Sequence, residues 1–111
     1  MVKHLELNAS RLKALGHPVR LSILRFVVQG PEGGTPAGEL QDRLGIPAST
    51  LSHHLAALAE ASLVKVEREG TFLRYRADFP ILQSLTEYLW EDCCKGGSGC
   101  CIPACSRKES L

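Results

Sequence analysis

The apolar residues of this chain recur at intervals of three and four over most of its length, which is the spacing of one face of an α-helix. Four stretches show this pattern: His4–Leu15, Pro18–Gln29, Pro36–Leu44 and Pro47–Ala61. A fifth stretch, Pro80–Cys94, is apolar over more than one face. Glycine or proline stands between consecutive stretches. We therefore expect five helices.

Between the fourth and fifth stretches the period changes to two. Apolar and charged residues alternate in Ser62–Arg68 and again in Thr71–Arg76, as is typical of half-buried strands. Glu69-Gly70 is the predicted two-residue connection, since glycine adopts the positive φ that tight hairpin turns require. The pattern predicts a mainly α fold with one β-hairpin.

The third and fourth predicted helices have the arrangement of a helix-turn-helix. We expect Thr35 to cap the third helix, with Pro36 at its first position. In the fourth, Leu51, Leu55 and Leu58 form an apolar stripe. Its first turns carry short polar side chains that can reach DNA bases and phosphates, or that merely form a capped, solvated turn. These residues are Ser49, Thr50, Ser52 and His53, with His54 beside them.

The predicted hairpin carries the local positive charge that a DNA-binding protein needs. The net charge of the whole chain is only +1, so a basic surface for DNA must be local. The cations of the hairpin are Lys65, Arg68, Arg74 and Arg76, against the two acids Glu67 and Glu69. We interpret it as a wing that contacts phosphates or the minor groove. The alternative is an edge hairpin whose charges prevent aggregation.

A chain of 111 residues with 44% hydrophobic residues forms one domain with a small core. The last helix is apolar enough to need a second burial surface, and a homodimer through the first and last helices provides one. Such a dimer would present two recognition helices to a palindromic operator. The chain shows no signal peptide or membrane span, which favours a cytoplasmic location. It shows no catalytic constellation, so we do not expect an enzyme.

Three segments together resemble the ArsR/SmtB family of dimeric winged-helix repressors. They read LKALGHPVRLSILRFV (Leu12–Val27), STLSHHLAALAEASLV (Ser49–Val64) and VEREGTFLRYRAD (Val66–Asp78). The resemblance implies a dimer that binds its operator and leaves it when an inducer binds. It places Ser49, Thr50, Ser52 and His53 where the family reads DNA. Two common inducer sites are missing: Pro36–Leu44 has no cysteine, and 80–92 has no histidine.

All five cysteines lie in the last nineteen residues, which divides the chain into a winged helix-turn-helix domain, 1–92, and a cysteine-rich tail, 93–111. Sulfur-only sites select soft ions, and trivalent arsenic takes three thiolates. The C-C-x5-C spacing resembles arsenite-responsive members of the family, which implies Cys93, Cys94 and Cys100 as ligands of As(III). Cys101 and Cys105 are possible further ligands. Antimonite, Sb(III), fits the same geometry, and a methylated arsenical needs only two sulfurs.

Other chemistries remain open for the tail. Four of its cysteines can supply a tetrahedral zinc site, although the spacing is unusual for zinc. Neighbouring thiols can form a redox switch through disulfides. The protein can also be a thiol-rich metal buffer whose winged helix is a relic, or the tail can be without function. No cofactor is expected to be required for DNA binding itself.

Overall fold

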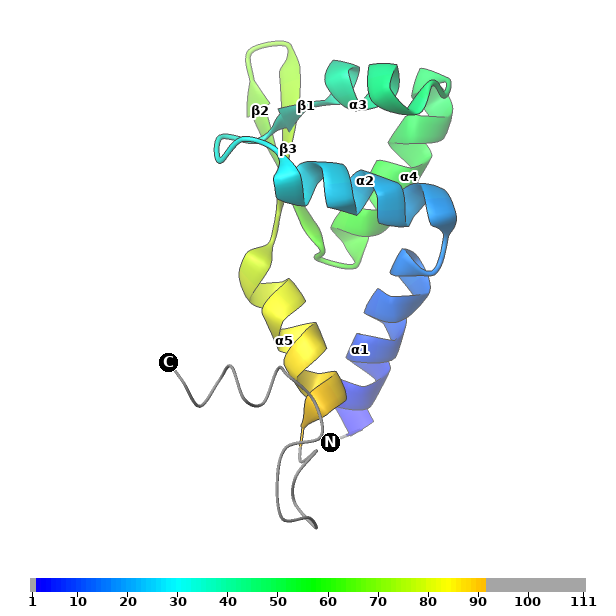
Figure 1. Cartoon of the computed structure of the whole chain (residues 1–111), viewed down its shortest axis with the longest axis vertical. Helices are drawn as coiled ribbons and strands as arrows, with labels where there is room; N and C mark the ends of the chain where they lie inside the picture. The colour runs from blue at the N-terminus through cyan, green and yellow to red at the C-terminus, as the bar shows by residue number, and fades with distance from the viewer. Residues whose placement is uncertain (1, 92–111) are drawn as a thin grey trace.

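The computed structural model describes residues 2–91 of the chain (Figure 1). It contains the five helices and the hairpin that the sequence predicts, and a third short strand joins the hairpin in one small sheet. The elements are α1 (Val2–Leu15), α2 (Pro18–Gln29), β1 (Thr35–Pro36), α3 (Ala37–Leu44), α4 (Ala48–Glu60), β2 (Val64–Glu69), β3 (Phe72–Ala77) and α5 (Phe79–Trp90).

The molecule has two ends with different roles (Figure 1). The tip of the β2–β3 hairpin, helix α3 and the first turn of α4 lie together at the top of the view. Helices α1 and α5 lie side by side at the bottom, and α2 crosses between the two groups. The helix-turn-helix and the hairpin therefore share one end, and the first and last helices share the other.

Local sequence signals explain where several helices begin and end. The His17 Nδ1 accepts a hydrogen bond of 3.2 Å from the Val19 amide and caps α2. The Asp78 carboxylate accepts a 3.3 Å bond from the Ile81 amide and caps α5. Gly45 ends α3 in the left-handed conformation, at φ 64°, which glycine adopts without a steric penalty.

Two predictions around the sheet are wrong in detail. Thr35 does not cap α3: it lies in β1, which pairs antiparallel with β3 through Thr35 opposite Tyr75, and Pro36 stands before the helix instead. Pairing with a strand forty residues away decides its conformation. The hairpin connection is Gly70-Thr71, because Glu69 still pairs with Phe72. Gly70 has φ 64°, so the glycine supplies the positive φ of the turn as predicted. It is the first of the two connecting residues, whereas the prediction made it the second.

Helix α5 ends earlier than its apolar pattern predicts. It stops at Trp90, and Glu91 has the extended values φ −54° and ψ 130°. The prediction of a helix continuing to Cys94 is therefore wrong, because the backbone leaves the helical conformation before the cysteines. All five cysteines lie outside the described residues.

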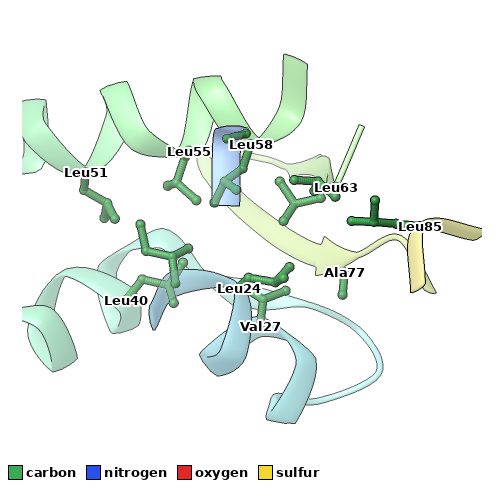
Figure 2. Packing of buried hydrophobic residues seen from close by; sticks show 12 residues of the cluster. Leu24, Val27, Leu40, Leu51, Leu55, Leu58, Leu63, Ala77 and Leu85 are labelled. Carbon is green, nitrogen blue, oxygen red and sulfur yellow. The ribbon is translucent and has the colours of Figure 1, made fainter. Parts of the chain in front are cut away.

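The core lies between α2, α4 and the hairpin (Figure 2). The predicted stripe of α4 is confirmed, since Leu51, Leu55 and Leu58 are all buried and point toward α2 and β3. The other large buried side chains come from α2, α3, the connection between α4 and β2, β2 itself and α5. They are Ile23, Leu24, Val27, Leu40, Leu63, Val64 and Leu85.

Helix α1 packs with an unexpected face. Its leucine stripe predicts a core face, yet Leu5 and Leu12 are exposed, whereas Asn8 and Arg11 are buried. Asn8 satisfies Arg11 in part, through a 3.1 Å hydrogen bond from the guanidinium to the Asn8 side-chain oxygen. Leu89 and Trp90 of α5 are also exposed. Both terminal helices thus leave apolar surface uncovered in the single chain.

Candidate nucleic-acid interface

Helix α4 is divided cleanly between a buried and an exposed face. Leu51 and Leu55 are 3% and 2% exposed. The four side chains predicted to read DNA all lie on the exposed face of the first half of the helix. They are Ser49, Thr50, Ser52 and His53. Because this half of α4 lies at the same end as the hairpin (Figure 1), both elements can approach one DNA duplex together.

The positive charge of the hairpin is partly neutralised from within. Arg74 Nε lies 3.1 Å from Glu69 Oε1, and Arg76 Nε lies 2.9 Å from Glu67 Oε1. The Arg76 pair is an ion pair without hydrogen-bond alignment, because its Nε has no hydrogen-bond partner. These contacts follow from the register, which aligns Arg74 with Glu67 and places all four charges on one face of the sheet.

Two cations of the hairpin are not paired in this way. Lys65 and Arg68 are exposed, and neither makes an ion pair within residues 2–91. Arg68 lies on the opposite face from Arg74, beside the exposed Val66. Of the predicted wing contacts, Arg68 is therefore available to phosphate at once, whereas Arg74 and Arg76 must first leave their carboxylates.

His54 does not belong to the exposed set. It is only 7% exposed, and its Nδ1 accepts a 3.1 Å hydrogen bond from Arg20 Nε of α2. The His17 ring lies 4.6 Å from the His54 ring, centroid to centroid. Burial first, and then the charges of His17, Arg20 and His53, lower the pKa of His54 below its usual range. Sequence reasoning missed Arg20, because no local pattern joins residues 34 positions apart.

The proposed inducer ligands lie outside the described part of the chain, so Cys93, Cys94, Cys100, Cys101 and Cys105 are not placed. Within residues 2–91, no group of three or more His, Cys, Asp or Glu side chains is arranged to hold a metal ion. Over the same residues, no helix is long and apolar enough to cross a bilayer.

Comparison with known proteins gives the family. A family model described as "Helix-turn-helix domain" matches residues 15–67. The transcriptional regulator YgaV of Escherichia coli is 40% identical over 70 residues, which are 63% of this chain and 69% of YgaV. The homodimeric domain of Mb0332 from Mycobacterium bovis, a possible ArsR-family regulator, is 30% identical with a TM-score of 0.64, over 80% of this chain and 87% of that one.

The chain belongs to the ArsR family of winged helix-turn-helix regulators. This ArsR-family protein is a DNA-binding transcriptional repressor and not an enzyme, in agreement with the sequence analysis. The similar Mb0332 domain is a homodimer. A further relative, a probable mercury resistance operon repressor of Streptomyces lividans, is 27% identical over 104 residues, or 94% of this chain and 79% of that protein.

Proposed function

We propose that this repressor leaves its operator when trivalent arsenic binds to Cys93, Cys94 and Cys100. The observation that carries the proposal is the distribution of the five cysteines: residues 1–92 have none, and all five fall between positions 93 and 105. Cysteines kept for packing would be scattered through the core. A cluster of thiols alone selects soft ions, and arsenite can exchange its three hydroxyls for three thiolates.

The operator side of the proposal rests on the exposed half of α4 and on the hairpin. Ser49, Thr50, Ser52 and His53 would contact base edges and phosphates in the major groove, and Arg68 the phosphates beside the hairpin. The homodimer would form through the apolar surfaces that α1 and α5 leave exposed, at the opposite end of the molecule. A two-fold axis there leaves both α4 helices free for the two halves of a palindrome.

The place of the cysteines suggests how binding is coupled to release. Cys93 follows the end of α5 by only three residues, and α5 packs against α1. A metalloid that gathers the three sulfurs would pull on the end of a dimerisation helix and change the spacing of the two α4 helices. Coupling free energies of about 1–3 kcal/mol are typical for two such sites, which lowers operator affinity about fivefold to 150-fold.

Fluorescence anisotropy of an operator duplex tests the proposal. The duplex is selected from a randomised pool by the wild-type dimer under reducing conditions, and then titrated with arsenite, antimonite, zinc and peroxide in parallel. We expect release near one arsenite per protomer. Cys93→Ser, Cys94→Ser and Cys100→Ser should each abolish release, whereas the matched control Cys105→Ser should keep it. Release by peroxide alone or zinc alone would replace arsenic as the inducer.

Mercuric ion is a second candidate inducer, because the Streptomyces lividans relative, a probable mercury resistance operon repressor, aligns over 94% of this chain. Mercuric ion is also soft and thiophilic, but it is satisfied by two thiolates. The Cys100→Ser variant separates the two ions. Loss of the arsenite response with the mercury response retained would assign mercury to the Cys93–Cys94 pair and arsenic to the full set of three.

A further inference from the structure

One hydrogen bond joins the recognition helix α4 to α2 through their side chains. Arg20 Nε of α2 donates to His54 Nδ1 of α4 over 3.1 Å. His54 is 7% exposed and follows the exposed His53 directly in the helix. The Arg20–His54 hydrogen bond therefore links the interior of the protein to the half of α4 that we propose faces DNA.

This contact requires the unprotonated form of the His54 Nδ1. The guanidinium of Arg20 keeps its protons at every accessible pH and can only donate. His54 can accept at Nδ1 only while that nitrogen carries no proton. A protonated ring would place two donors and two positive charges face to face, so the bond would break.

We propose that Arg20 and His54 are positioning residues for operator binding, and that protonation of His54 weakens binding by releasing α4 from α2. The effect would not depend on the cysteine tail or on any inducer, and it goes beyond the proposed function. Arg20 acts through His54 and need not contact DNA itself.

The surroundings of His54 oppose its protonation from several elements. His17, at the start of α2, lies 4.6 Å away between ring centroids, and its own Nδ1 is used by the Val19 amide. His53 of α4 lies 5.6 Å away, and Arg20 faces the ring from α2. These groups and burial lower the pKa of His54. Lys13 of α1 and Glu60 of α4 line a small cavity beside Arg20.

The sign of the pH effect separates this proposal from a direct contact. A histidine that touches phosphate gains a positive charge on protonation and strengthens binding as the pH falls. Protonation of the buried His54 has the opposite consequence. A fall of affinity in acid, present also in a His53→Gln variant, is therefore the signature of the Arg20–His54 contact.

The first experiment measures operator affinity between pH 7.5 and pH 5.0, by anisotropy with the selected duplex and reduced protein. Because the pKa of His54 lies below its usual range, we expect the affinity of the wild type and of His53→Gln to fall only in the acid part of this interval, by up to about tenfold, the effect of one pKa unit. His54→Asn keeps an acceptor near the Nδ1 position and does not titrate, so its affinity should stay constant. A wild-type affinity that is flat or that rises in acid would overturn the proposal, whether or not the variant folds.

The second experiment asks whether Arg20 acts through His54 or on DNA. Arg20→Met keeps the aliphatic stem and removes the donor, and Arg25→Met is the matched control on the exposed side of the same helix. We expect Arg20→Met to weaken binding about tenfold at pH 7.5, to lose the pH dependence, and to keep the wild-type salt slope. If Arg20→Met instead reduced the slope of log affinity against log salt concentration by about one unit for each arginine removed, Arg20 would contact a phosphate. A result equal to that of Arg25→Met would also overturn the proposal.

Discussion

Removing the two carboxylates of the hairpin should strengthen operator binding and make it more dependent on salt. Glu67 and Glu69 hold Arg76 and Arg74 at 2.9 and 3.1 Å. The double change Glu67→Gln and Glu69→Gln releases both guanidinium groups without changing side-chain size. The same change raises the charge of the hairpin from +2 to +4, because four cations then face no acid.

The size of the effect follows from the exposure of the pairs. Their side chains are 37% to 73% exposed, and exposed pairs are worth about 0.2–1 kcal/mol each. A dimer contains four of them, so at about 0.5 kcal/mol each the gain is about 2 kcal/mol, or about 30-fold in affinity. If all four arginines then reach phosphates, the salt slope steepens by up to about 3.6.

Anisotropy of the selected duplex, measured at salt concentrations of about 50 to 300 mM, gives both the operator affinity and its dependence on salt. The control carries the same charge change at the other end of the molecule, Glu6→Gln with Glu87→Gln, and should show neither effect. Unchanged affinity and slope in the hairpin variant would mean that Arg74 and Arg76 do not reach DNA. Weaker binding would mean that the ion pairs hold the hairpin in its binding shape.

Three further predictions concern stability, measured by urea unfolding at one fixed protein concentration because the protein is expected to dimerise. Leu58 is 0% exposed, so Leu58→Ala should cost about 3 kcal/mol; a cost below about 1 kcal/mol would contradict the core described above. Asp78→Ala removes the cap of α5 and should cost about 1 kcal/mol, while Asp78→Asn, which keeps an acceptor, should cost less. Burial lowers the pKa of His54 below 6.5, so in acid the unfolded chain binds more protons than the folded chain does. The free energy of unfolding should therefore fall as the pH drops below 6.5. An equal fall in His54→Asn would assign the effect to other groups.

How far the sequence determines the structure depends on how local each feature is. The helix bounds of α2 match the prediction residue for residue, since Pro18 and the apolar period act within a few turns. The caps of Asp78 and His17 are equally local, since each side chain accepts from an amide three or two residues further on. The alternation in β2 and β3 also correctly places Glu67 and Arg74 on one face of the hairpin and Val66 on the other, although Arg68 lies on the face of Val66.

The exposed polar face in the first half of α4, which we propose reads DNA, was predictable for the same reason. Burial of Leu51, Leu55 and Leu58 leaves Ser49, Ser52 and His53 on the outside of the helix, as the helical spacing requires. The cysteine cluster is a sequence property as well, and its role stays a prediction because its residues lie outside those that the structure describes.

Features that join distant residues were decided by the tertiary structure. Thr35 has the local signature of a helix cap but pairs with Tyr75, because β3 offers backbone partners that the cap does not. The polar Arg11 of α1 is buried and the leucines are exposed, because the packing of α1 on its neighbours determines which face is covered. From the sequence, His54 is indistinguishable from the other polar residues of α4, and only the fold brings Arg20 into hydrogen-bonding distance of its ring. Periodicity describes one element at a time, whereas these contacts depend on how two elements meet.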